Sequence, residues 1–203
     1  MRVLVVGAGI IGTIYGWALS ESGYHVAHLV RSGRATALRD GLPLDVFDLR
    51  KGHRREFREL YRLDAVETVS PTDTFELVIV PVKHYALVQA LKEVVPKVGA
   101  AEFSILTQNW RGTDDIDSIL PRSRYIYGDA KAGGTFSEGT LAAAIKAVDL
   151  GSPIMKDPTI EGKLTAFSVP VCDADSHQIL LSIHWSQALV THNTVLCPET
   201  VLA

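Results

Sequence analysis

Short aliphatic runs and apolar residues at helical spacing follow one another along most of the chain. Residues 3–6 form an unbroken aliphatic run, which is typical of a central parallel strand covered on both faces. Apolar residues at helical spacing then predict a helix over about 10–22, and the apolar run at 24–30 predicts a second strand. The chain therefore opens with a strand–helix–strand unit whose first turn, at 7–12, is rich in glycine.

The same patterns continue and predict a mainly parallel sheet. Strands are expected where aliphatic runs lie between turn signals, at 75–82, 102–107 and 124–128. Helices are expected at 32–40, 85–95 and 114–120. Residues 42–49 and 56–61 predict a hairpin, 65–69 predicts a short strand, and 131–145 with 147–150 are expected to be antiparallel strands that finish the sheet. We predict an α/β fold, a Rossmann-type doubly wound sheet with an antiparallel extension.

The glycine-rich segment has the spacing of a dinucleotide-binding turn, G-x-G-x-x-G. Gly7 permits a tight turn, Gly9 allows the backbone to approach a pyrophosphate, and Gly12 lets the helix lie close to the strand. Backbone N–H groups at the start of the helix, at Ile10 and Ile11, then face the phosphates. Structural glycine turns share this spacing, but the flanking strand, helix and second strand favour the dinucleotide site.

The residue that ends the second predicted strand lies beside the 2′ position of the adenosine ribose. NAD sites use an acidic residue there, whereas this chain has Arg31 followed by Ser32. A guanidinium and a hydroxyl suit a 2′-phosphate, which a carboxylate would repel. NADP(H) is therefore favoured over NAD(H), and the alternative is that Arg31 is a solvated loop charge.

Two more polar residues follow strands that end at the same edge of the sheet, where ligands of open α/β sheets bind. Lys83 follows the strand at 75–82 and could meet a substrate carboxylate or the cofactor, or it is an exposed lysine at the start of a helix. Asn109 follows the strand at 102–107 and could hydrogen-bond a nicotinamide ribose or a substrate carbonyl, or close a turn.

The composition is that of an ordinary globular protein. The chain has 203 residues, of which 47% are hydrophobic and 21% charged, and its formal charge of −3 gives no general attraction to nucleic acid or anionic lipid. No apolar run approaches the ~20 residues of a membrane-spanning helix, and the N-terminus has no signal-peptide layout, so a cytoplasmic location is expected. Cys172 and Cys197 are expected to be free thiols, because their spacing is not that of a metal site.

Two clusters of side chains have a simpler interpretation than ligand binding. Residues 50–62 are the most basic part of the chain, but Glu56 and Glu59 interrupt them, so a solvated hairpin is favoured over a nucleic-acid patch. The histidines of the C-terminal part recur with too much separation to converge on a metal, and are expected to be surface or interface residues. They are His177, His184 and His192, in a segment expected to be helical.

Four motifs in a fixed order give the chain a resemblance to the ketopantoate reductase (2-dehydropantoate 2-reductase) family. They are GAGIIG at 7–12, LVRSG at 29–33, VPVK at 80–83 and QN-x-x-G at 108–112. The segment 133–139 is similar as well. The resemblance implies an NADPH-binding Rossmann-like domain, taken as 1–168, followed by the opening helices of an all-helical domain at 169–203, with the active site in the cleft between them.

The resemblance also implies roles and a reaction. Arg31 would hold the 2′-phosphate, while Lys83 and Asn109 would line the nicotinamide and substrate end. The family transfers a hydride from NADPH to the keto carbon of an α-keto acid, giving a 2-hydroxy acid in pantothenate biosynthesis. This reaction needs a hydride held close to the carbonyl and a donor that stabilises the developing alkoxide.

The chain departs from the family where that donor is expected. The family has a lysine early in the helical domain, in a W-x-K pattern followed by asparagines. Aligned on the tryptophan, the lysine position holds Gln187; aligned on Asn193, it holds Leu189. Gln187 and Asn193 are thus the catalytic candidates in this segment. Glutamine is not an acid near neutral pH, so catalysis is expected to be much weaker unless Lys83 or His192 substitutes.

Two hypotheses therefore stand side by side. The first is an NADPH-dependent reductase of a small keto acid. The second is a non-catalytic NADP(H)-binding or sensing module, because the lysine is missing and the sequence stops inside the opening helices of the second domain. Such a chain would be truncated, or completed by another subunit, and exposed apolar residues near its end could drive homodimerisation.

Overall fold

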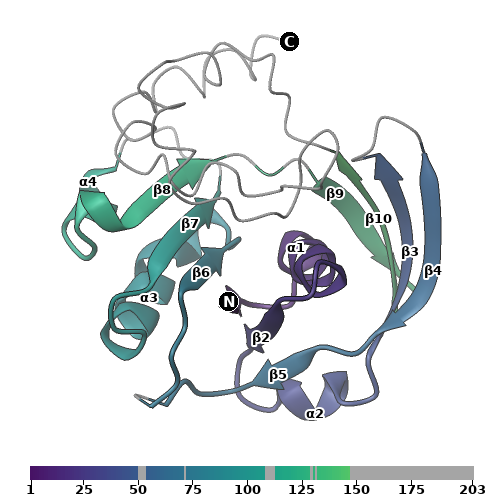
Figure 1. The fold of residues 1–203 in the computed structure, drawn as a ribbon, viewed down its shortest axis with the longest axis horizontal. Coiled ribbons are helices and arrows are strands. Elements are labelled where there is room, and N and C mark those ends of the chain that lie inside the picture. Colours follow the sequence, from purple (N-terminus) through teal and green to yellow (C-terminus); the bar gives the residue numbers. More distant parts are fainter. Residues whose placement is uncertain (50–53, 71, 108–112, 129, 131, 147–203) are drawn as a thin grey trace, which may run out of the picture.

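The structure, a computed structural model, describes residues 1–49, 54–70, 72–107, 113–128, 130 and 132–146 (Figure 1). Its first elements are β1 (Arg2–Val6), α1 (Ile10–Glu21), β2 (His25–Leu29), α2 (Arg34–Leu38), β3 (Leu42–Leu49), β4 (Arg55–Tyr61) and β5 (Asp64–Val66). They are followed by β6 (Leu77–Val80), α3 (His84–Val94), η1 (Val95–Lys97), β7 (Glu102–Leu106), α4 (Asp114–Asp117), η2 (Arg122–Arg124), β8 (Tyr125–Gly128), β9 (Ala132–Ser137) and β10 (Thr140–Lys146). The predicted elements are confirmed within a few residues, except that the helix expected to run to 120 ends at Asp117.

A parallel sheet of six strands forms the centre of the described structure, in the order β5-β2-β1-β6-β7-β8. If only these six strands are numbered, in their order along the chain, the sheet has the order 3-2-1-4-5-6 of a doubly wound Rossmann sheet. This order confirms the predicted α/β class. β1 pairs with β2 on one side and β6 on the other, and Val3, Leu4 and Val5 are fully buried. The chain reverses direction across the sheet at β1, so the crevice at the carboxyl ends of β1 and β6 is where a ligand is expected.

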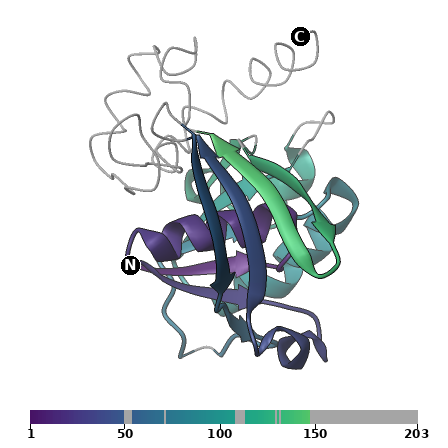
Figure 2. The ribbon, with the colours of Figure 1, turned by 90° about the vertical axis from the view of Figure 1, so that its right-hand side faces the viewer.

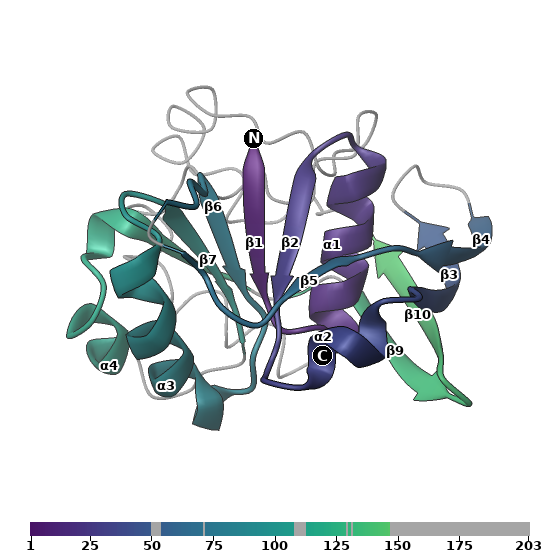
Figure 3. The same ribbon diagram turned by 90° about the horizontal axis from the view of Figure 1, so that it is seen from below.

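Helices cover both faces of this sheet (Figure 3). α3 and α4 lie on one face and α1 on the other, and a core cluster fills each side. All residues of α1 from Gly12 to Leu19 are buried. A helix buried on every side needs a second apolar surface opposite the first, and here a second sheet supplies it.

That second sheet has the order β4-β3-β10-β9 and packs across α1 (Figure 2). β3 and β4 form the predicted antiparallel hairpin. The antiparallel strands expected at 131–145 are confirmed as β9 and β10, but the expectation that they finish the main sheet is wrong: they belong to the second sheet, where β10 runs parallel to β3. The reason is that Leu141, Ala143 and Ile145 are apolar on one face and bury it in the core cluster of α1. Residues 147–150 lie outside the described part.

Acidic neighbours pair with the arginines at 54, 55 and 58 of the basic hairpin. Arg54 lies 2.7 Å from Glu56, and Arg58 lies 3.3 Å from Asp45 across the β3–β4 pair. Arg55 is paired with the buried carboxylate of Asp48. These pairs support the interpretation of the segment as a charged, solvated hairpin.

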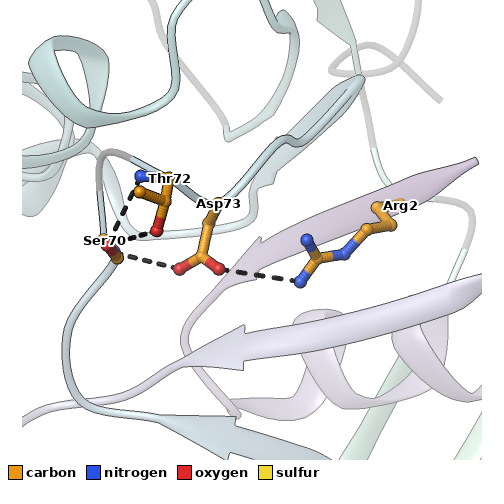
Figure 4. A network of polar contacts seen from close by, with 4 residues as sticks. All are labelled: Arg2, Ser70, Thr72 and Asp73. Atoms are coloured by element: carbon orange, nitrogen blue, oxygen red, sulfur yellow. Dashed lines mark hydrogen bonds and ion pairs between the residues drawn. The ribbon is translucent and has the colours of Figure 1, made fainter.

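A polar turn ties β6 to the start of β1, at the edge of the sheet opposite to the expected ligand edge (Figure 4). The Ser70 N–H donates to Asp73 Oδ2 over 3.0 Å, and Arg2 lies 3.8 Å from the other oxygen of Asp73. The Ser70 hydroxyl also lies 2.8 Å from that of Thr72.

Within the described residues, no helix is long and apolar enough to cross a membrane.

Candidate cofactor site

A cavity of about 500 Å³ opens at the carboxyl ends of β1 and β2 and reaches along α3. The glycine turn forms its floor through Gly7, Ala8 and Gly9. The first residues after β2 and the start of α2 form one wall, and one face of α3 forms the other. The cavity thus lies where parallel α/β sheets bind their ligands.

The glycine turn has no room for side chains on its inner side and open space on its outer side. Gly7 has a φ of +99°, a conformation that favours glycine. A Cβ on Gly12 would lie 2.9 Å from the Gly7 carbonyl oxygen and 3.1 Å from Val5, so glycine lets α1 pack against β1. Gly9 is the N-cap of α1, and nothing lies within 4 Å of where its Cβ would be. This space beside the N-terminus of a twelve-residue helix suits an anion such as a diphosphate.

Two arginines stand on the wall that follows β2. Arg31, the candidate for the 2′-phosphate, lines the cavity, and Arg34, at the first position of α2, joins it. Both side chains are exposed, and among the described residues neither is paired with a carboxylate. The sequence signal for Arg34 was its place three residues after Arg31, at the start of the predicted helix. Two unpaired guanidinium groups on one wall form a basic site for an anionic substituent.

The opposite wall is a face of α3, for which the sequence predicted a helix but no contact with a ligand. Tyr85, Gln89 and Glu93 line the cavity at one-turn intervals. The Tyr85 side chain is 84% exposed, so its ring is available to a flat aromatic ligand such as a purine. Glu93 lies 4.0 Å from Lys97, the last residue of the following short helix η1.

The other predicted site residues are placed less directly. Ile10, Ile11 and Gly12 form the first turn of α1 and do not line the cavity. Lys83 is the exposed N-cap residue of α3; Val82 and Tyr85 on either side of it reach the cavity, but it does not. The remaining candidates lie outside the described residues: Asn109, Gln187, His192 and Asn193, together with the domain boundary at 168/169. No group of three or more metal-ligating side chains occurs in the described part.

Behind the glycine turn lies a buried histidine that the sequence analysis did not single out. His28, in β2, is fully buried. Its Nδ1 lies 3.0 Å from the Gly7 carbonyl oxygen, and its Nε2 lies 3.1 Å from the hydroxyl of Tyr61 in β4. Burial lowers the pKa of His28, and the hydrogen bond to Gly7 and the carboxylate of Asp64 act in the opposite direction. The ring is therefore neutral near pH 7.

A second polar cluster fixes the chain where it leaves the 108–112 segment. Asp117 accepts hydrogen bonds from the buried Tyr125 hydroxyl over 2.6 Å and from the Thr113 hydroxyl over 3.1 Å. Arg122 lies 3.4 Å from the same carboxylate. Burial, together with the hydrogen bond to Asp117, raises the pKa of Tyr125. This cluster joins α4 to β8.

The fold and the cavity define the N-terminal, cofactor-binding type of domain found in NAD(P)-dependent dehydrogenases. The ketopantoate reductase PanE/ApbA family description matches residues 3–148, and the chain belongs to that family. The family is one of NAD(P)-dependent oxidoreductases. The resemblance seen in the sequence motifs is thereby confirmed.

Individual relatives cover the chain to different extents. The 2-dehydropantoate 2-reductase of Aquifex aeolicus is 25% identical over 173 residues, which are 85% of this chain and 47% of that protein. The uncharacterized oxidoreductase YkpB of Bacillus subtilis is 38% identical over 97 residues, 47% of this chain and 29% of that protein. The chain thus spans less than half the length of either curated relative.

Solved structures share the fold at low identity. The 2-dehydropantoate 2-reductase from Geobacter metallireducens matches with a TM-score of 0.57 and 22% identity, over 71% of this chain and 46% of that one. A D-mandelate dehydrogenase, solved with NADH and anilino(oxo)acetate, matches with a TM-score of 0.53 and 20% identity, over 70% of this chain and 45% of that one. These likenesses place the described residues in the N-terminal fold of such enzymes.

Proposed function

We propose that the chain binds NADP(H) in the cavity between the glycine turn and α3, as the cofactor-binding half of a keto-acid reductase. The observation that carries this proposal is the pair Arg31 and Arg34 on the wall after β2, beside a glycine turn with open space at Gly9. The diphosphate would lie at the N-terminus of α1, and the adenosine along α3 near Tyr85. When bound, the cofactor supplies the hydride.

The two arginines support NADP(H) over NAD(H). A 2′-phosphate in this cavity would meet two guanidinium groups that no carboxylate of the described residues pairs with. A hydrogen bond to a charged group contributes roughly 1.5–3 kcal/mol, which corresponds to a factor of about 10–150 in affinity. NADH lacks the phosphate and would leave this interaction unmade. We therefore expect at least tenfold tighter binding of NADPH than of NADH.

Calorimetric titration tests this assignment. The wild-type chain is titrated with NADPH and with NADH, beside Arg31→Ala/Arg34→Ala and the control Arg39→Ala, an exposed arginine that does not line the cavity. The double variant is expected to lose the preference for NADPH while it keeps its affinity for NADH, and the control is expected to behave as wild type. Absence of binding to either nucleotide would contradict the proposal. Equal affinity of the wild type for both would leave the dinucleotide site and remove the choice of NADP(H).

For the reaction, we propose hydride transfer from NADPH to an α-keto acid such as ketopantoate. Lys83 stands where β6 passes into α3, at the carboxyl edge of the sheet, and there it can meet a substrate carboxylate. Asn109, Gln187 and Asn193 keep their proposed roles by resemblance alone. Turnover of NADPH with a panel of keto acids is the test, and a chain that binds NADPH but oxidises it with none of them contradicts the reductase.

The glutamine at position 187 supports a second candidate function, that of a module that binds NADP(H) without turnover. This residue stands where the family's pattern has lysine, and an amide cannot give up a proton to the alkoxide. Introducing Gln187→Lys restores an acid at that position. If the chain is a reductase weakened at this point, NADPH oxidation rises in the variant with little change in NADPH affinity. If the chain is a binding module, oxidation stays at background in both.

A further inference from the structure

We propose that His28 is a positioning residue for the diphosphate-binding turn: it holds the Gly7 carbonyl toward the core and thereby directs the Ala8 N–H toward the cavity. This inference rests on the proposed function, since it concerns how the turn receives a diphosphate. His28 itself lies in β2, behind the turn, and does not line the cavity.

The protons of the His28 ring follow from its two partners. A carbonyl oxygen can only accept, so Nδ1 carries the hydrogen and donates to Gly7 over 3.0 Å. In a neutral imidazole Nε2 then has a lone pair, and the Tyr61 hydroxyl, 3.1 Å away, donates to it. The Ser20 hydroxyl donates to the Gly16 carbonyl over 2.9 Å, which leaves the Tyr61 hydrogen for the histidine. The Gly7 carbonyl thus selects the Nδ1–H tautomer, and the Tyr61 hydroxyl satisfies the remaining ring nitrogen.

The hydrogen bond from His28 sets the direction of the next peptide unit. In a planar trans peptide the C=O of one residue and the N–H of the next point in opposite directions. The Gly7 carbonyl points to His28, so the Ala8 N–H points away from it, to the side on which Ala8 lines the cavity. The Gly7 N–H is also fixed, by the Leu29 carbonyl at 2.7 Å. Both ends of the Gly7 residue are therefore held by β2.

The surrounding elements are shaped around the imidazole. A Cβ on Gly16 would lie 2.3 Å from His28 Nε2 and 3.1 Å from the Tyr61 hydroxyl, so α1 has glycine where it crosses the ring. The His28 and Tyr61 rings meet edge to face, with centroids 5.8 Å apart. Among the described residues, the polar side chains that face this pair are Ser20 from α1 and Asp64 from β5. The second sheet is thereby linked to the glycine turn.

Two variants test the hydrogen bonds of the two His28 ring nitrogens separately. The amide nitrogen of asparagine takes the place of histidine Nδ1, and that of glutamine the place of Nε2. His28→Asn can therefore still donate to Gly7, whereas His28→Gln reaches only toward Tyr61. Both are neutral at every pH and each gives up one of the two hydrogen bonds. His25→Gln, at an exposed position of the same strand, is the control.

Dissociation constants for NADPH and NADH, with the urea midpoint of each variant, test the proposal on the full chain. His28→Gln is expected to bind both nucleotides roughly tenfold more weakly, the worth of about one hydrogen bond, and His28→Asn to recover most of that loss. The ratio of the two constants should stay at its wild-type value in both variants, because the nucleotides share the diphosphate. The control should bind as wild type does.

Distinct outcomes separate this inference from the proposed function. A wild-type chain that binds neither nucleotide overturns the proposed function and this inference with it. A wild-type chain that binds, with His28→Gln as tight as His28→Asn, overturns only the positioning role, as does an affinity loss that merely follows the loss of stability. If neither variant folds, long-range ¹H–¹⁵N spectra of the wild type decide: the Nδ1–H tautomer of His28 is expected, and the Nε2–H form contradicts the proposal.

Discussion

Replacing Gly16 with alanine is expected to destabilise the protein, although alanine is the better helix former. Gly16 lies in the interior of α1, where exchanging glycine for alanine normally stabilises a helix by roughly 1 kcal/mol. Here the added Cβ would lie 2.3 Å from His28 Nε2 and 2.6 Å from its Cε1. A Cβ atom does not approach a non-bonded atom this closely, so the imidazole must leave its place between Gly7 and Tyr61.

The magnitude follows from three contributions. Overpacking a core costs roughly 1–3 kcal/mol, and leaving a buried polar group of the His28–Tyr61 pair without its partner costs roughly 1–3 kcal/mol more. The helix propensity of alanine returns roughly 1 kcal/mol. We expect the free energy of unfolding to fall by about 3 kcal/mol, the middle of the resulting range.

Urea unfolding of single and double variants measures this effect. His28→Ala removes the ring that the new methyl group would strike, so Gly16→Ala is expected to be harmless in the His28→Ala background, a coupling that a double-mutant cycle reports. Gly133→Ala is the control, because nothing lies within 4 Å of a Cβ at that position of β9. A Gly16→Ala variant as stable as the wild type, or equally costly with and without His28, would refute the reasoning.

Three further predictions concern ionisable groups. Burial lowers the pKa of His28 below the ordinary value of 6.5, so on acidification the unfolded chain binds this proton before the folded protein does. The stability that is present above pH 6.5 is therefore lost as the pH falls toward the pKa of the folded state. His28→Asn should flatten that part of a plot of the urea midpoint against pH. Burial raises the pKa of Tyr61 from 10.0 to about 12, so stability should fall as the pH rises from 10 toward 12. Tyr61→Phe should reduce this loss and leave the part that comes from other buried tyrosines such as Tyr125; an unchanged profile argues against the prediction. Asp117→Asn weakens the carboxylate contact with Tyr125 and should lower the free energy of unfolding by roughly 1–2 kcal/mol, whereas the exposed neighbour Asp115→Asn should not.

The parallel sheet could be predicted because each of its strands has a local signal. Residues 3–6 form an aliphatic run that only a doubly covered strand explains, and the glycines that follow mark the turn. The partner of the 131–145 segment could not be predicted in the same way. Alternating residues show that a strand is buried on one face but not which sheet it joins, and β10 pairs with β3, which is far away in sequence.

The same distinction holds for the site. Arg31 was a candidate because it directly follows a strand, whereas Arg34 and Tyr85 reach the cavity from helices whose sequences carry no ligand-binding motif. His28 was missed because a histidine within a strand has no pattern that separates it from ordinary core residues. The sequence feature that accompanies His28 is Gly16, a glycine inside a predicted helix. The reason for this glycine becomes visible only when β2 brings His28 against the helix.

The most direct test of the cofactor site is an NADPH titration of the ¹⁵N-labelled chain followed by ¹H–¹⁵N correlation spectra. The account predicts that the largest amide shifts occur at the glycine turn, at Ala8, Gly9 and Ile10, and at Arg31 and Arg34 after β2, with smaller shifts in the second sheet. No shifts, or shifts that leave the glycine turn and both arginines unchanged, would contradict it.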